Sequence, residues 1–225
     1  MSKRNNVLAI VAHPDDEVLG CGGTIMRHLT KGDYVNIIVL ADGVTAREYS
    51  TKVPRTREIK KHKKLIEIRA KEFHNSTKIM GIKKQDCYML SFPDQRLDAL
   101  PLLDIIKKIE KIAKKTKPNI IYTHHWGDLN KDHRVCLEAT LTAFRPTKRE
   151  NAKIAIYSFP ISGNMNILQP KNMYKFKPNH FVDINKCRDR KIKALKAYKS
   201  EFSNLNICFT RDKNIKSLEG FVKIK

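Results

Sequence analysis

The sequence predicts a single α/β domain over residues 1–225, built on a mainly parallel, twisted sheet with helices on both faces in a Rossmann-like arrangement. Three observations support this fold class. Short apolar runs alternate with amphipathic segments of helical period, which is the β-α-β order of parallel sheets. The first run, 7–12, is apolar throughout, as a strand covered on both faces is. Polar side chains gather directly after several runs, where parallel sheets bind their ligands.

The predicted elements follow in order along the chain. Strands are expected at 7–12, 34–40, 86–90, 118–125, 154–159 and 180–184, and helices at 20–30, 59–81, 100–117, 132–144 and 185–202. The helix 100–117 carries isoleucines and lysines at spacings that place them on opposite faces, as in a helix packed on a core. Gly81 lies where a glycine commonly ends a helix, and Asn185 where an N-cap is favoured. The stretch between 158 and 180 is rich in proline, asparagine and glycine and is expected to be a long loop.

The net charge is unusually positive. The chain has 45 Lys+Arg against 23 Asp+Glu, a formal charge of +22. Such a field attracts nucleic acid and anionic lipid headgroups. The lysines of 60–64 and 106–117 are, however, spaced as on the solvated face of a helix, and no aromatic residues interleave with a basic motif. The charge therefore favours a lysine-rich surface and makes nucleic acid a poor candidate partner, although a basic polyanion-binding protein with a degenerate site stays as an alternative.

The hydrophobic pattern and the cysteines exclude some classes of protein. No apolar run approaches the ~20 residues of a transmembrane helix. The apolar stretch before His13 is short for the core of a signal peptide, so we expect a cytoplasmic protein. The five cysteines are scattered and form no CxxC pair, which argues against a disulfide framework or a cysteine–zinc site. The sequence leaves open whether the chain forms a homo-oligomer.

Two clusters of histidine and aspartate follow two of the predicted strands. His13, Asp15 and Asp16 follow the first strand. The second cluster consists of His124, His125, Asp128, Asp132 and His133. Imidazole and carboxylate are the ligands that a catalytic zinc takes from a protein, usually three of them plus a water. We therefore expect one Zn²⁺ per chain, held by His13, Asp16 and His133 with one position left open.

The two adjacent aspartates are expected to have different roles. Asp15 would accept a proton from the attacking water, while Asp16 is neutralised by the metal. An alternative interpretation treats "HPDD" as a strand-to-helix turn in which Asp15 or Asp16 caps the helix. The second cluster favours the metal site. The "GCGG" stretch that follows lacks the spacing of a dinucleotide fingerprint, and its glycines are expected to let the helix approach the sheet or the site closely.

These residues resemble a known family. "AHPDDEVLGCGGT" and the downstream "GDLNKDHRV" are similar to the motifs of the PIG-L/LmbE-like de-N-acetylases, and "EIRAKEF", "SFPDQRLD" and "AYKSEF" resemble further segments of that family. The resemblance covers about residues 5–205. It implies a zinc-dependent enzyme that removes acetyl groups from N-acetylglucosamine-type sugars on lipids, small thiols and other glycoconjugates. It implies His13, Asp16 and His133 as zinc ligands and Asp15 as general base, the same assignment that the ligand chemistry gives.

The resemblance also implies two substrate-binding residues, Arg69 and Asp94, which would contact sugar hydroxyls. For Arg69 the alternative is a surface ion pair on a basic helix. For Asp94 the alternative is a capped turn after Pro93.

The chain departs from the family pattern at Asn130, where many members carry a histidine that stabilises the oxyanion or supplies a proton. Asparagine can donate a hydrogen bond but cannot supply a proton. Either Asn130 stabilises the tetrahedral oxygen, or His124 or His125 takes over the role. A third alternative is that Asp15 carries the proton to the leaving amine. Asp132 is expected to support catalysis by orienting a histidine.

The sequence thus predicts a metal-dependent N-deacetylase, an amide hydrolase for a small-molecule, lipid-linked or nucleotide-linked amino sugar. A zinc amidase for a sugar–thiol conjugate or a non-sugar amide is the second enzymatic hypothesis. Because both would share the fold and the metal site, only the rim loops 42–58 and 160–180 are expected to discriminate between these substrates.

Overall fold

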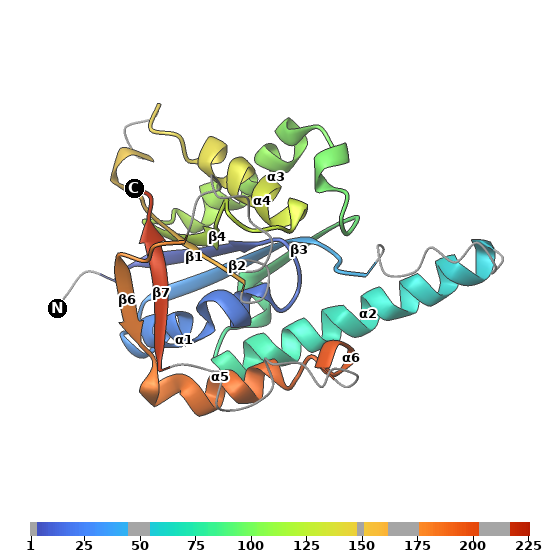
Figure 1. Cartoon of the computed structure of the whole chain (residues 1–225), viewed down its shortest axis with the longest axis horizontal. Helices are drawn as coiled ribbons and strands as arrows, with labels where there is room; N and C mark the ends of the chain where they lie inside the picture. Colours follow the sequence, from blue (N-terminus) through green and yellow to red (C-terminus); the bar gives the residue numbers. More distant parts are fainter. Residues whose placement is uncertain (1–3, 45–54, 148–150, 162–175, 203–216) are drawn as a thin grey trace.

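The computed structural model describes residues 4–44, 55–147, 151–161, 176–202 and 217–225, with the backbone alone over 55–61. These residues form one mixed sheet of seven strands in the order β3-β2-β1-β4-β5-β7-β6, with helices on both faces (Figure 1). Strands β1 to β5 pair in parallel, while β7 is antiparallel to both β5 and β6. The predicted fold class, a mainly parallel α/β sheet, is confirmed. Among the described residues, no helix has the length and apolar character needed to cross a bilayer.

The strands and helices lie close to their predicted positions. The strands are β1 (Asn6–Val11), β2 (Tyr34–Ala41), β3 (Cys87–Phe92), β4 (Ile120–His124), β5 (Ala155–Phe159), β6 (His180–Asp183) and β7 (Leu218–Lys223). The α-helices are α1 (Asp16–Thr30), α2 (Arg55–Met80), α3 (Leu102–Thr116), α4 (Lys131–Ala143), α5 (Arg188–Leu195) and α6 (Lys199–Phe202). Short 3₁₀ helices occur at Lys84–Asp86, Leu97–Ala99, Asn151–Lys153 and Asn185–Cys187.

Two hydrophobic layers cover the sheet. On one face lie α1, α2 and α5, and on the other lie α3 and α4 (Figure 1). Helix α3 buries Ile105, Ile109 and Ile112 and exposes Lys107 and Lys111, as its sequence period predicts. Strand β1 contributes side chains to both layers, which is why all of its apolar residues are buried.

Glycines allow α1 to pack closely on its neighbours. A Cβ at Gly20 would lie 2.1 Å from the Phe159 ring at the end of β5, and one at Gly23 would lie 2.6 Å from Ile184. Contacts that short are sterically impossible, so both positions require glycine. The expectation that the "GCGG" glycines permit close approach is confirmed.

Some predicted boundaries were wrong. Helix α1 begins at Asp16, four residues before the predicted start, and departs from helical dihedrals at Cys21. Glycine has a poor helix propensity, and tertiary packing overrides it here. The single helix predicted for 185–202 is divided into a 3₁₀ turn, α5 and α6. Asn185 is not an N-cap, because it lies inside the 3₁₀ turn and its amide donates to Asp183 Oδ1 at 2.9 Å. Strand β7 had no predicted counterpart.

Candidate metal centre

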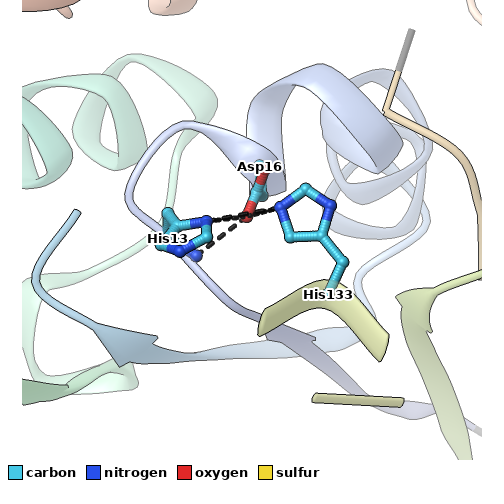
Figure 2. Close-up of side chains that lie close together, drawn as sticks. All are labelled: His13, Asp16 and His133. Atoms are coloured by element: carbon cyan, nitrogen blue, oxygen red, sulfur yellow. Dashed lines mark hydrogen bonds and ion pairs between the residues drawn. The ribbon is translucent and has the colours of Figure 1, made fainter. Parts of the chain in front are cut away.

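The predicted metal ligands come from the carboxyl ends of two neighbouring strands. His13 and Asp16 lie in the turn from β1 to α1, and His133 lies in the first turn of α4, which follows β4. Strands β1 and β4 are paired in parallel, so their ends are adjacent. Figure 2 shows the three side chains pointing toward a common point. All three are almost completely buried.

The three donor atoms form a nearly equilateral triangle, called the metal triangle below. His13 Nδ1 lies 3.4 Å from Asp16 Oδ2 and 3.3 Å from His133 Nε2, and the third edge, from His133 Nε2 to Asp16 Oδ2, is 3.4 Å. A tetrahedral zinc with bonds of ~2.0–2.1 Å separates its ligand atoms by about 3.3–3.4 Å. The triangle therefore has the size that this ion requires.

The hydrogen-bond partners of the two histidines assign their tautomers. His133 Nδ1 lies 2.8 Å from Asp128 Oδ2, and His13 Nε2 lies 3.0 Å from Asp94 Oδ1 and 3.1 Å from Asp132 Oδ2. Carboxylates accept, so these outer nitrogens carry the protons. When the two imidazoles are neutral, their inner nitrogens present lone pairs to one another and to the Asp16 carboxylate oxygen. Three such atoms that face each other could hold a metal ion.

The electrostatics of the triangle also favour positive charge. Burial opposes protonation of His13, but the Asp132, Asp16 and Asp94 carboxylates outweigh it and hold its pKa well above the usual value. Burial likewise opposes protonation of His133, yet Asp16 chiefly raises its pKa to about 9. For Asp16, burial is outweighed by the neighbouring imidazoles, which hold its pKa well below the ordinary value. The carboxylates that favour protonated histidines would also favour a divalent cation at this position.

Asp15 lies beside the triangle with a different environment. Burial raises the pKa of Asp15 to about 7, although the Arg69 guanidinium acts in the opposite direction. A pKa in this range suits a group that accepts a proton near neutral pH. Asp15 occupies the N-cap position of α1, but its side chain makes no capping hydrogen bond. The Asp16 carboxylate accepts from the His13 amide at 2.8 Å, within the turn. The capping interpretation of the two aspartates is therefore wrong.

A cavity of about 370 Å³ opens over the triangle. Its lining includes His13, Asp15, Asp16, Asp94, Asn130 and His133. Glu201 of α6, which lies in the "AYKSEF" segment but received no predicted role, also lines it. A volume of this size accommodates a sugar ring or a similarly small group. Six of the eight predicted site residues thus share one cavity.

The other two predicted site residues, Arg69 and Asp132, are not part of the described cavity lining. Asp132 lies behind His13 and also accepts from the amides of Gln95 and Leu97. Arg69 is 1% exposed, which rules out the surface ion pair. Its guanidinium donates to the Pro14 carbonyl and lies 3.4 Å from Asp15 Oδ2. Its guanidinium also lies 3.2 Å from Glu201 Oε1, so it contacts two residues that line the cavity, and the expected contact of Arg69 with sugar hydroxyls stays a prediction.

The groups proposed to replace the missing histidine lie in different places. Asn130 caps α4, since its Oδ1 accepts from the Asp132 amide at 2.9 Å, and it lines the cavity. His124 Nε2 accepts from the Ala12 amide at 2.9 Å. Burial and neighbouring His133 lower the pKa of His124 to about 4, so it is unsuited to supply a proton near neutral pH. His125 Nδ1 lies 3.0 Å from Ser158 Oγ, and neither histidine is part of the described cavity lining.

Sequence reasoning gave no role to several residues near the site. Asp128 belonged to the second cluster but received no role. Its position five residues before His133 is the signal that could have identified it as the carboxylate supporting that histidine. Asp42, which follows β2, is buried, and its Oδ1 accepts from the Val44 amide at 2.8 Å, a turn contact. Most of the predicted rim loops, 42–58 and 160–180, lies outside the described residues.

Known proteins resemble this chain in sequence and in fold. The family model PIG-L, described as GlcNAc-PI de-N-acetylase, matches residues 8–144. The uncharacterized deacetylase YaiS of Escherichia coli (strain K12) is 32% identical over 149 residues, 64% of this chain and 70% of that protein. The probable N-acetyl-alpha-D-glucosaminyl L-malate deacetylase 2 of Bacillus anthracis is 26% identical over 205 residues, 90% of this chain and 84% of that protein.

A solved structure shares the fold. The N,N'-diacetylchitobiose deacetylase of Pyrococcus horikoshii superimposes with a TM-score of 0.69 at 23% identity, covering 97% of this chain and 83% of that one. The family model spans more than half of the chain and includes all three residues of the metal triangle. The chain belongs to the PIG-L family.

Proposed function

We propose that this protein is a zinc-dependent hydrolase that removes the N-acetyl group from an N-acetylglucosamine-type amino sugar. The observation that carries the proposal is the metal triangle of His13 Nδ1, Asp16 Oδ2 and His133 Nε2, which lies at the base of a cavity beside the Asp15 carboxylate. The deacetylase names of the relatives support the same reaction type.

His13, Asp16 and His133 would hold one Zn²⁺ per chain. When bound, such an ion polarises the acetyl carbonyl and lowers the pKa of water. Asp128 and Asp132 hold the protons on the outer nitrogens of the two histidines, so that the inner nitrogens stay available as ligands.

Asp15 is the proposed general base. It lines the cavity, and its raised pKa allows it to take a proton from water and later give one to the departing amine. Asn130 would stabilise the tetrahedral oxygen, because its Oδ1 is used in capping α4 and its amide NH₂ remains as the donor. This division assigns proton transfer to Asp15 and hydrogen bonding to Asn130.

The substrate class follows from the relatives and the cavity. Relatives are named for N-acetyl-alpha-D-glucosaminyl L-malate and for diacetylchitobiose, which share an N-acetylated glucosamine unit. We propose that Asp94, which lines the cavity, contacts hydroxyls of this sugar. A small-molecule, lipid-linked or nucleotide-linked sugar would share that unit, and so would a sugar–thiol conjugate.

The first experiment combines metal analysis with acetate release. We expect about one zinc per purified chain and release of acetate from N-acetylglucosamine derivatives. A panel of free sugar, sugar–thiol conjugate, lipid-linked sugar and simple non-sugar amides identifies the acceptor. A chain without bound metal that instead binds polyanions in a salt-sensitive manner would replace the enzyme with the polyanion-binding alternative.

The second experiment tests the base. Asp15→Asn should keep the metal and lower kcat by about 10²–10⁴-fold, the usual contribution of general-base catalysis. Asp104→Asn, an exposed aspartate on α3, is the matched control and should leave kcat unchanged. Wild-type turnover in Asp15→Asn would remove Asp15 from the mechanism.

A further inference from the structure

The backbone of Asp15 has an unusual conformation. Its φ is 108° and its ψ is −27°, in the left-handed region that L-residues other than glycine rarely adopt. Such a conformation persists only where the surrounding structure holds it. The residues that hold Asp15 therefore decide where its carboxylate points.

Glu17 holds the amide of Asp15. Its Oε2 accepts from the Asp15 N–H at 2.9 Å, and its Oε1 accepts from the Tyr198 hydroxyl at 2.6 Å. Glu17 is fully buried, and so is Tyr198, which follows α5. A buried carboxylate is costly unless it is hydrogen-bonded, and here both oxygens have a donor. The pair thus links the start of α1 to the end of α5.

Arg69 of α2 holds the other side of the same turn. Its guanidinium donates to the Pro14 carbonyl and lies beside the Asp15 carboxylate. The Tyr198 ring lies 5.2 Å from the Arg69 guanidinium carbon, in cation–π geometry. Tyr198 therefore supports both residues that fix the Asp15 turn. The amide and the carboxylate of Asp15 are each held by a different side chain.

We propose that Glu17 is a positioning residue, which fixes the left-handed turn at Asp15 and thereby aims the base at the cavity. This inference rests on the proposed function, in which Asp15 accepts the proton. Glu17 is not part of the described cavity lining, so it acts through Asp15 rather than on the substrate. Tyr198 is the donor that keeps the Glu17 carboxylate in place.

The test compares two buried glutamates that both accept backbone N–H groups of α1. Glu17→Met keeps the side-chain length but removes both acceptor oxygens, and it should lower kcat about 10²-fold, the size expected for a misplaced catalytic group. KM and zinc content should stay unchanged. Glu219→Met is the matched control, because Glu219 accepts from the amides of Gly23 and Thr24, away from the cavity. It should lower stability but leave kcat unchanged.

A second variant and a second readout complete the test. Tyr198→Phe keeps Glu17 and should lower kcat by about tenfold, the effect of one lost hydrogen bond. Hydrogen exchange at the Asp15 amide should be slow in the wild type and faster in both variants. This readout does not depend on turnover, so it still tests the contact if the wild type releases no acetate, a result that would overturn only the proposed function.

Two results would overturn the inference. The first is wild-type kcat in Glu17→Met together with a loss of stability like that of Glu219→Met, which would make Glu17 purely structural. The second is unchanged exchange at the Asp15 amide. If Glu17→Met does not fold, kcat and amide exchange in Tyr198→Phe decide between the two roles.

Discussion

Two buried polar clusters contact α1, and they differ in how their hydrogen-bond acceptors are satisfied. The metal triangle lies at the start of the helix. The second cluster, called the Glu219 cluster below, lies farther along it and consists of Glu219 of β7, Lys191 of α5 and the amides of Gly23 and Thr24. Both clusters are buried and both contain charged groups. Burial and charge alone therefore do not distinguish a ligand site from a structural contact.

The difference lies in the count of donors and acceptors. Glu219 Oε1 accepts from Gly23 N and Lys191 Nζ, and Oε2 accepts from the amide and the hydroxyl of Thr24. Lys191 Nζ also donates to the Leu19 carbonyl at 3.0 Å. Protein donors satisfy this carboxylate completely. In the metal triangle three potential ligand atoms face each other, an arrangement that could hold a metal ion.

The largest expected effect comes from removing one corner of the triangle. His133→Ala should abolish stoichiometric zinc binding and reduce acetate release below detection, because two ligands hold a catalytic zinc poorly. Zinc per chain after dialysis and acetate release measure this. Unchanged zinc content would show that the metal lies elsewhere.

The opposite result is expected in the Glu219 cluster. Lys191→Met leaves a buried carboxylate without its cation and should lower the free energy of unfolding by about 3–5 kcal/mol. Turnover per folded, zinc-loaded molecule should not change. Urea unfolding together with active-site-normalised kcat separates the two effects, and a loss of kcat without a loss of stability would contradict the comparison.

A smaller effect is expected behind the triangle. Asp128→Asn removes the carboxylate that holds the proton on His133 Nδ1, and the loss in zinc affinity or turnover should be about 10–100-fold. A competition titration against a zinc chelator measures it. Wild-type affinity and kcat would show that the orientation of His133 does not depend on Asp128.

The smallest effect concerns a third polar cluster, which has its hydrogen bonds complete. His28 Nδ1 lies 2.7 Å from Asp33 Oδ2, and its Nε2 lies 3.0 Å from the Tyr122 hydroxyl. Burial lowers the pKa of His28 despite the raising effect of Asp33. The unfolded chain then binds more protons than the native state below about pH 6.5, so stability falls as the pH decreases through that range.

His28→Gln removes this contribution. Between about pH 7 and about pH 5.5, the wild type should lose more unfolding free energy than the variant does. Urea unfolding at the two pH values measures the difference. An equal loss in both proteins would show that His28 does not sense pH in the folded state.

The sequence was most informative where the signals are local. The apolar run before His13 and the lysine–isoleucine period of 100–117 each act over a few residues, and both elements were predicted close to their observed bounds. The sequence also indicated that the residues of the metal triangle lie close together. Each histidine cluster directly follows a strand, and neighbouring parallel strands end at the same edge of a sheet.

Tertiary contacts explain what the sequence did not predict. Strand β7 contains Gly220 and the buried Glu219, neither typical of a strand, and its pairing with β5 and β6 overrides those preferences. The contact of Tyr198 with Glu17 joins residues 181 positions apart. No local sequence period marks such a pair. The alternative interpretation of Arg69 as part of a surface ion pair was wrong for the same reason, because Arg69 is buried by contacts with residues distant in the sequence, such as Pro14.

The most direct test of the account is a crystal structure of the zinc-loaded protein with anomalous scattering recorded at the zinc edge. We predict one strong peak within the triangle, bonded to His13 Nδ1, Asp16 Oδ2 and His133 Nε2, and none at the Glu219 cluster. A protein that takes up stoichiometric zinc but shows no peak between these three atoms would contradict the account.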